Sequence, residues 1–299
     1  MKKTESIWHN GVLKPWDEST THVLTHTLHY GGGAFEGIRF YATDQKPAIF
    51  RLPEHIQRLV YSSEVLGMKL NYTQAEIIQA TIDLVKSNGL PAGYIRPISY
   101  YGYKELGVSA KGNPVELVIA NWHWGKYLPH DMVDIKVSKY RRISPDATVI
   151  DAKICGHYIG GILASIELDG SHYHEALFMD YNDNIAEGAG ENFFIVKDQI
   201  IYTPSLGHIL PGITRATIIE ITRHYGYTVV EQQITLTQAL NADEAFFTGT
   251  AVEVTPIKSI NDKIIGAGTI GPVTKFIKQT YDDVVHGRNN DFIHYLTFV

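Results

Sequence analysis

The sequence contains a single cysteine, Cys155, so it can form no internal disulfide, and a reducing cytoplasm is the expected compartment. No apolar run approaches the ~18 residues that a membrane-spanning helix needs. The opening residues, MKKTESIWHNG, carry two lysines without an apolar stretch behind them, so a secretory signal is not expected. These shortages predict a globular, cytoplasmic protein.

Basic residues are also in the minority. The 26 lysines and arginines face 32 acidic residues, giving a formal net charge of −6. This balance argues against nucleic acid or an anionic membrane as the main partner. A length of 299 residues can bury a sizeable core, and it is near the size at which one core gives way to two domains.

Residues 1–121 combine short strands with two helices. Pro53 stands at the first-turn position that proline favours in a helix. Thr73 and Glu76 form a capping-box pattern for a second helix, which Gly89 ends. The expected strands lie within 7–50, at 93–103 and at 115–122.

Residues 122–133, WHWGKYLPHDMV, mix aromatic residues with glycine and proline. Linkers are normally polar, so this composition indicates an interdomain loop that also lines a site. Residues 134–299 follow with strands interspersed with helices, including helices at 157–168 and 215–226. A regular βαβ rhythm is missing, so we expect a two-domain protein of mixed α+β or α/β structure.

The stretch IAEGAGENFFIV contains two glycines, Gly188 and Gly190, and two glutamates, Glu187 and Glu191. A dinucleotide-binding loop needs a helix after its glycines, whereas these run into the apolar strand NFFIV. We therefore expect a hairpin turn. It is either a plain turn or one that directs a carboxylate into a pocket.

His22, His26 and His29 would share one face of a helix, and such spacing can bind zinc. No cysteine is close enough in sequence to complete a metal site, and the glycine run that starts at Gly31 ends any helix. Half-buried histidines beside an aromatic strand are the more ordinary interpretation, and no metal is predicted.

Two turns rich in small residues offer backbone donors. LPGITRAT places Gly212, Ile213 and Thr214 at a helix start, where free N–H groups and the helix dipole favour an anion such as phosphate. The alternative is simple capping by Thr214. The second turn, TGTAVE, contains Gly249, Thr250 and Ala251.

Arg39 and Arg96 lie in apolar or aromatic strands, where a forked guanidinium can bind a carboxylate at two points. Structural ion pairs are the alternative. Arg58, on a predicted helix, would ordinarily be solvated. Three tyrosines lie near these arginines in sequence: Tyr30, Tyr94 and Tyr127.

Lys153 lies in VIDAKICGHY, between apolar segments. In a partly apolar pocket a lysine can lose its proton and act as a nucleophile. A lysine, an anion-binding turn, an inward carboxylate and carboxylate-binding arginines are the groups that pyridoxal phosphate chemistry needs.

These motifs together resemble the branched-chain amino acid aminotransferases, pyridoxal 5'-phosphate enzymes of fold type IV. The matching segments occur in this order: HYGGGAFEGIRFY, EHIQRL, YIRP, AKICGHY, EGAGENFF, LPGITR and TGTAVEVTPI. The resemblance implies a small α/β domain over 1–121, the loop 122–133 lining the site, and a cofactor-binding pseudo-barrel over 134–299. It also implies a homodimer as the minimal assembly, with hexamers among some relatives.

The resemblance further implies roles for individual residues. Lys153 would form the Schiff base and transfer protons. The expected cofactor-binding residues are Arg58, Tyr158, Glu187, Gly212, Ile213, Thr214, Gly249 and Thr250. The expected substrate-binding residues are Tyr30, Phe35, Gly37, Arg39, Tyr94, Arg96, Trp124, Tyr127 and Ala251. The implied reaction is a ping-pong exchange of amino groups between leucine, isoleucine or valine and 2-oxoglutarate.

Several rival functions stay open at this point. D-amino acid aminotransferases, (R)-amine transaminases and an aminodeoxychorismate lyase share the lysine and the glutamate, although YIRP and FEGIR favour the branched-chain enzyme. A metal-dependent hydrolase built on the three histidines and a non-catalytic binding module are further alternatives.

Overall fold

The structure, a computed structural model, describes residues 2–125, 127–128 and 130–299, and the chain divides into two compact units. Lys126 and Pro129, in the predicted interdomain loop, lie outside the described residues. Unit 1 comprises Met1–Gly125, Ala152–His157 and Val284–Val299, and unit 2 comprises Lys126–Asp151 and Tyr158–Asp283.

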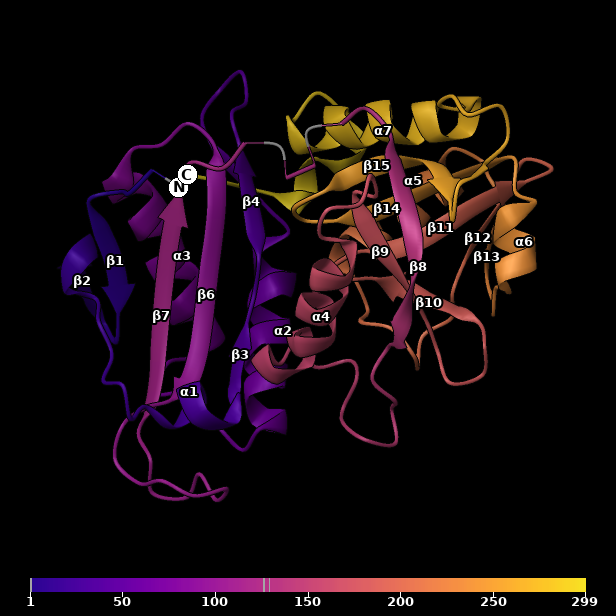
Figure 1. Ribbon diagram of the computed structural model, residues 1–299. Coiled ribbons are helices and arrows are strands. Elements are labelled where there is room, and N and C mark those ends of the chain that lie inside the picture. The colour runs from indigo at the N-terminus through magenta and orange to yellow at the C-terminus, as the bar shows by residue number, and fades with distance from the viewer. Residues whose placement is uncertain (1, 126, 129) are drawn as a thin grey trace. The chain divides into compact units, whose positions relative to one another are not determined.

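Unit 1 is built on an antiparallel sheet, in the order β17-β5-β4-β6-β7-β1-β2, with β3 also paired to β6 (Figure 1). The long strand β6 alternates buried and partly exposed side chains, as a pleated strand does. Ile95 therefore faces the core, while Arg96 points to the opposite face. The strands are β1 (Ser6–His9), β2 (Val12–Pro15), β3 (Gly33–Phe35), β4 (Ile38–Tyr41), β5 (Ala48–Phe50), β6 (Gly93–Tyr101), β7 (Val115–Trp122) and β17 (Leu296–Phe298).

Helices α2 (Leu52–Val65) and α3 (Gln74–Asn88) cover the core face of this sheet (Figure 1). The predicted capping box is confirmed: Thr73 accepts from the Glu76 N–H and the Glu76 carboxylate accepts from the Thr73 N–H. Gly89 ends α3 in the left-handed conformation. The helices and the sheet share one apolar core that includes Ile38, Phe40, Ile56, Leu59, Ile77, Leu84, Ile95 and Ile119.

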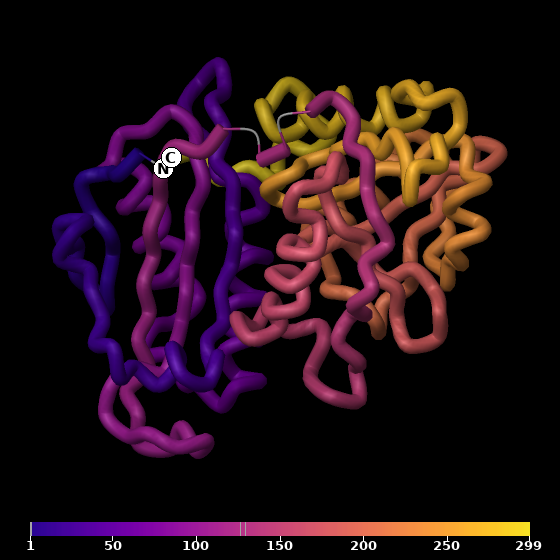
Figure 2. Tube along the Cα trace, viewed as in Figure 1, coloured from indigo at the N-terminus to yellow at the C-terminus, as the bar shows by residue number. Residues whose placement is uncertain are grey.

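The C-terminal residues belong to unit 1 because β17 pairs with β5, with Leu296 opposite Phe50. Figure 2 shows the yellow C-terminal end of the chain running back to the indigo and purple part. Helix α7 (Pro272–Val285) crosses the boundary between the units in its last turn. The consecutive domain ranges expected from the sequence stay a prediction.

Unit 2 contains a closed barrel. Its ring runs β10-β9-β8-β15-β14-β11 and returns to β10 through the pair Glu187 and Asn192. Closure leaves no free edge in the ring. Strand β8 runs parallel to its two neighbours, whereas the other ring pairs are antiparallel. The ring strands are β8 (Val133–Arg141), β9 (Glu175–Met179), β10 (Ile185–Gly188), β11 (Asn192–Lys197), β14 (Glu244–Gly249) and β15 (Glu253–Ile260).

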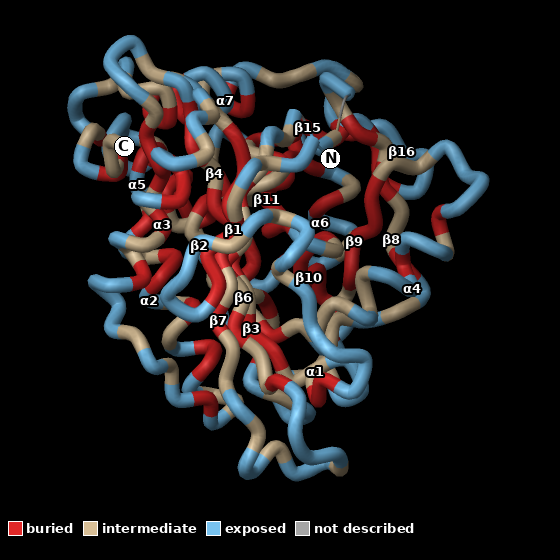
Figure 3. The backbone as a smooth tube through the Cα atoms, turned by 90° about the vertical axis from the view of Figure 1, so that its left-hand side faces the viewer, coloured by how far each residue is buried: buried red, intermediate tan, exposed pale blue. Residues whose placement is uncertain are grey.

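Further strands extend the barrel sheet, and helices pack around it. Phe193 and Phe247, both fully buried, are among the largest side chains of the barrel core. Buried residues follow the strands, and the loops are mostly exposed (Figure 3). The remaining elements of unit 2 are α4 (Ile159–Leu168), β12 (Ile200–Thr203), α5 (Ile213–His224), β13 (Val229–Glu231), α6 (Leu236–Leu240) and β16 (Lys263–Ile264).

One local expectation was wrong. Gly212, not Thr214, is the N-cap of α5, because the extended backbone at Gly212 already places Thr214 inside the first turn. The three histidines do not share a helix, because α1 spans only His26–Tyr30. In the part of the chain that the structure describes, no helix has the length and apolarity to cross a membrane.

Candidate active site

Lys153 is held by its backbone on both sides. Its N–H donates to Ser62 Oγ at 2.8 Å, and its carbonyl accepts from the Phe35 N–H at 3.1 Å. A bridge between Ala34 and Ile154 continues this pairing. The half-buried Lys153 side chain ends with Nζ 5.0 Å from the centre of the Phe35 ring. Unit 1 therefore fixes this amine against an aromatic wall.

Arg96 stacks on two aromatic rings of this wall, those of Phe35 and Tyr94. Its guanidinium carbon is 4.6 Å from the Phe35 ring centre and 5.6 Å from the Tyr94 ring centre. Among the described residues, the buried Nε of Arg96 has no hydrogen-bond partner. The stacking argues against a structural ion pair as its main role. An unpaired buried donor beside apolar rings suits a ligand that carries a carboxylate.

Aromatic rings extend the wall. Tyr94 meets Trp124 edge-to-face at 4.6 Å between ring centres. Gly37 makes room for Tyr94, since a Cβ at position 37 would come within 1.9 Å of the Tyr94 hydroxyl oxygen. The structure thus brings together Phe35, Gly37, Tyr94, Arg96, Trp124 and Lys153 from the predicted set.

The residues expected at the polar edge of the pocket lie close to loop backbone. Arg39 donates to the Gly125 carbonyl at 3.1 Å, and the Tyr30 hydroxyl accepts from the Gly107 N–H at 3.1 Å. Tyr30 remains about half exposed, and Tyr127, in unit 2, is exposed. The assignment of these two tyrosines to the site stays a prediction.

Arg58 is not solvated. Its Nε donates to one carboxylate oxygen of Glu36 at 2.5 Å, and its Nη2 donates to the other at 3.0 Å. His55 Nδ1 lies 2.7 Å from the same carboxylate. Burial raises the pKa of Glu36, but the Arg58 guanidinium and His55 outweigh burial and hold it well below its usual range.

In unit 2, Glu187 lies at the pair that closes the barrel, and its buried carboxylate accepts hydrogen bonds from several groups. Arg142 Nε donates at 2.5 Å, the Asn192 side chain at 3.1 Å, and the Leu210 N–H at 3.1–3.2 Å. The hairpin between β10 and β11 therefore directs a carboxylate inward. This agrees with the second of the two interpretations of IAEGAGENFFIV, in which the turn is not a plain one. This excludes a dinucleotide-binding loop, since no helix follows the glycines.

The N-terminus of α5 lies next to this carboxylate. Asn192 also donates to the Leu210 carbonyl, and its Oδ1 would be only 1.9 Å from a Cβ at position 212. Glycine is therefore required at this approach. Gly212 has no side chain to cap the helix, and the first-turn N–H groups of a helix without such a cap favour an anion.

The remaining predicted residues lie on β14, on the turn that follows it and at the start of α4. Gly249 ends β14, beside the hairpin turn, with the Gly190 carbonyl 3.4 Å from the position of a Cβ. Thr250 and Ala251 form the turn that follows. Tyr158 is half-buried at the start of α4.

Sequence reasoning missed five residues that support the site: Glu36, His55, Ser62, Arg142 and Asn192. Glu36 and Asn192 belong to quoted motifs, FEGIR and GENFF, and an acidic or amide residue directly beside a phenylalanine was a usable signal. Ser62 and Arg142 gave no such signal, because their partners lie 91 and 45 residues away in the sequence.

The three histidines do not assemble a metal centre. His26 Nε2 pairs with the Gly107 carbonyl, His29 Nε2 with the Val23 carbonyl, and His22 stacks on Tyr103. Within the described ranges, no cluster of three potential ligands could hold a metal ion.

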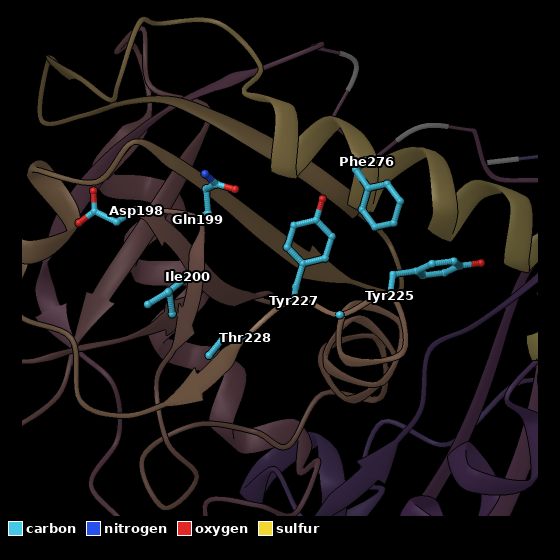
Figure 4. A pocket seen from close by; sticks show the side chains of 8 residues that line it. Asp198, Gln199, Ile200, Tyr225, Tyr227, Thr228 and Phe276 are labelled. Carbon is cyan, nitrogen blue, oxygen red and sulfur yellow. The ribbon is translucent and has the colours of Figure 1, made fainter.

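A separate groove of about 550 Å³ lies on unit 2 (Figure 4). Tyr225, Tyr227 and Phe276 form its aromatic side, and Asp198 and Gln199 its polar end. Its lining includes none of the predicted site residues, so it does not contribute to the site described above.

The groups in each unit fit pyridoxal phosphate. Unit 2 offers a buried carboxylate for a protonated ring nitrogen and an uncapped helix N-terminus for a phosphate. Unit 1 offers an amine, held by its backbone beside an aromatic ring, and an oriented arginine. Each of these donors or acceptors matches one functional group of that cofactor.

The barrel unit with its inward carboxylate, together with the lysine-bearing unit 1, defines a fold type IV enzyme. The family model described as Amino-transferase class IV matches residues 33–260, and the chain belongs to this family of aminotransferases.

Named relatives match over almost the whole chain. The branched-chain-amino-acid aminotransferase of Pseudomonas aeruginosa is 43% identical over 297 residues, covering 98% of this chain and 97% of the relative. The Escherichia coli K12 enzyme of the same name is 37% identical, with 97% and 96% covered.

Solved structures that are similar to this chain are also branched-chain amino acid aminotransferases. A T.th. branched-chain amino acid aminotransferase, complexed with N-(5'-phosphopyridoxyl)-L-glutamate, superimposes with a TM-score of 0.96 at 40% identity, covering 100% of this chain and 99% of that one. The same enzyme has also been solved with 4-methylvaleric acid.

Proposed function

We propose that this aminotransferase exchanges amino groups between L-leucine, L-isoleucine or L-valine and 2-oxoglutarate, giving branched-chain 2-oxo acids and L-glutamate. The observation that carries the proposal is the position of Arg96, whose guanidinium lies over the Phe35 ring and whose Nε has no hydrogen-bond partner among the described residues. A cation for a carboxylate, set among apolar rings, suits an amino acid with an aliphatic side chain.

The cofactor is pyridoxal 5'-phosphate, which when bound acts as an electron sink for the bond that breaks at the substrate's α-carbon. Lys153 would hold the cofactor covalently through its amine, and the same amine would move the proton at the substrate's α-carbon. Glu187 would keep the ring nitrogen of the cofactor protonated, and Tyr158 would donate to its ring oxygen. The hydrogen bonds that Ser62 and Phe35 make to the Lys153 backbone keep the amine in place through both half-reactions.

In this proposal, a charged side chain and backbone dipoles both bind the phosphate. Arg58 supplies the cation, and the first turn of α5 supplies N–H groups and a partial positive charge. The residues assigned to the phosphate are Arg58, Gly212, Ile213, Thr214, Gly249 and Thr250.

Substrates are held by the α-carboxylate and by the side chain. Tyr94 and Arg96, with the turn at Thr250 and Ala251, bind the α-carboxylate. Phe35, Gly37 and Trp124 form the apolar wall for a branched side chain. Tyr30, Arg39 and Tyr127 accept the distal carboxylate of glutamate, so that one pocket serves both partners of a ping-pong reaction.

A homodimer is the proposed assembly, and α4 supports it. Ile159, Ile162 and Ile166 are 58%, 56% and 65% exposed, and Leu163 adds to the same helix surface. An apolar helix face of this kind is characteristic of an interface. The cytoplasm is the proposed location, in keeping with the single cysteine.

The test is a substrate panel on the purified full-length chain. We expect glutamate to form from 2-oxoglutarate with L-leucine, L-isoleucine or L-valine, and an absorption band of the cofactor Schiff base that shifts when L-leucine is added. Lys153→Ala abolishes both, whereas Lys139→Ala, at an exposed position, preserves both. Turnover of D-alanine or an (R)-amine instead of L-leucine would assign the protein to another fold type IV activity.

A further inference from the structure

Glu36 is the most completely buried acidic side chain of unit 1, and four donors converge on it. Besides the two bonds from Arg58, it accepts from His55 Nδ1 at 2.7 Å and from the Gly37 N–H at 3.2 Å. The side chains of Glu36, His55 and Arg58 are 0%, 2% and 12% exposed. Such a group stays charged only because its partners surround it.

The pairing is side-on, which fixes the plane of the guanidinium. Nε and Nη2 of Arg58 both contact Glu36, so the edge that carries Nη1 is directed away from the carboxylate. A guanidinium whose Nε and Nη2 edge is occupied can present only the edge that carries Nη1 to an anion. A long side chain without this contact would sample many rotamers and lose entropy on binding.

His55 completes the arrangement as a neutral donor. Burial lowers the pKa of His55, and the cations of Arg58 and Lys153 lower it further, against the opposing effect of Glu36. A neutral imidazole donates to Glu36 without cancelling its charge, so Arg58 remains the only cation that contacts this carboxylate among the described ion pairs.

We infer that Glu36, supported by His55, is the positioning residue that orients Arg58 toward the phosphate of the cofactor. This inference rests on the proposed function, since that function assigns the phosphate to Arg58. Glu36 acts through Arg58 and touches neither the substrate nor the reacting atoms. It is therefore expected to influence the affinity for the phosphate specifically.

The test compares two probes on the full-length apoprotein: pyridoxal 5'-phosphate and pyridoxal, which lacks the phosphate. Glu36→Gln is expected to raise the Kd for pyridoxal phosphate by about tenfold or more, in the range found when the supporting partners of other ligand-binding groups are removed. The Kd for pyridoxal should remain within about twofold, and kcat at saturating pyridoxal phosphate should fall less than the affinity.

A double-mutant comparison separates positioning from a general effect on the fold. In an Arg58→Ala background, Glu36→Gln should produce no further loss of affinity for pyridoxal phosphate. Equal losses for both probes, or an undiminished loss in the Arg58→Ala background, would overturn the inference.

A second pair of variants covers the case in which Glu36→Gln does not fold. His55→Leu removes the donor to Glu36 and should weaken pyridoxal phosphate selectively, whereas His55→Asn keeps a donor near the position of Nδ1 and should restore binding. If neither His55 variant changes the ratio of the two affinities, the inference is wrong. If the unmodified chain binds no pyridoxal phosphate at all, the proposed function fails, and this inference fails with it.

Discussion

The backbone N–H of Lys153 donates a 2.8 Å hydrogen bond to the hydroxyl oxygen of Ser62, which is fully buried on α2. The same helix carries His55 and Arg58. One helix of unit 1 therefore sets both the segment that bears the proposed catalytic amine and the arginine assigned to the phosphate.

Ser62→Ala should weaken both the fold and the catalysis. The substitution leaves the Lys153 N–H without its acceptor, and an unpaired buried donor costs about 1–3 kcal/mol in the free energy of unfolding. We also expect kcat to decrease, because the segment that carries the amine loses a backbone anchor. Urea denaturation and steady-state kinetics measure the two effects. Ser87→Ala, on the exposed side of α3, is the control and should change neither.

Arg142→Met should be much more destabilising than Arg141→Met, although the positions are adjacent. Arg142 pairs with Glu187, and both side chains are largely buried, so its loss should lower the free energy of unfolding by about 3 kcal/mol. Arg141 pairs with the exposed Asp183, and such pairs contribute about 1 kcal/mol or less. Equal effects in urea denaturation would show that the Glu187 carboxylate does not depend on this partner.

Gly37→Ala should impair substrate binding while leaving the cofactor bound. The added methyl group would lie 1.9 Å from the Tyr94 hydroxyl oxygen, so the Tyr94 ring must shift from its present position. We expect a higher KM for L-leucine and an unchanged Kd for pyridoxal phosphate. Gly160→Ala in α4 has no atom near the new Cβ, and it should leave KM unaltered. An unchanged KM in Gly37→Ala contradicts the assignment of Tyr94.

Stability should depend on pH through His55. Because the pKa of His55 in the folded state is below its ordinary 6.5, the unfolded chain takes up a proton that the folded chain refuses as the pH decreases through 6.5. The free energy of unfolding should therefore decrease with acidity. His55→Asn removes this proton uptake and should flatten the slope by at most about 1.4 kcal/mol per pH unit.

The measurement is urea denaturation of both proteins between about pH 7.5 and pH 5.5. The comparison isolates His55 from the other 13 of the 14 histidines, which both proteins share. Parallel slopes for the two proteins would mean that His55 titrates equally in the folded and unfolded chains.

Ile166→Glu should prevent the proposed dimer. Ile166 is 65% exposed on α4, and a charge at an apolar interface must be desolvated without a partner. We expect a monomer by analytical ultracentrifugation. Ile264→Glu, at a 47% exposed isoleucine on β16, is the control and should remain dimeric. A dimeric Ile166→Glu variant would place the interface elsewhere.

Local rules in the sequence predicted the two long helices of unit 1 and indicated the chemistry of the site. The capping box at Thr73 and Glu76 and the left-handed Gly89 depend on neighbouring residues, so they were predictable. The motifs around Lys153, Glu187 and Gly212 indicated the groups of a cofactor site, because each group is local to a short segment.

Only the tertiary structure decided which residues support those groups. The barrel closes where Glu187 pairs with Asn192, and Glu36 meets Arg58 through the packing of β3 and α2. The N-cap at Gly212 was also misassigned from sequence, because the contact with Asn192, not helix propensity, selects glycine there. Contacts between distant segments follow from how elements pack, and no local pattern of residues encodes that packing.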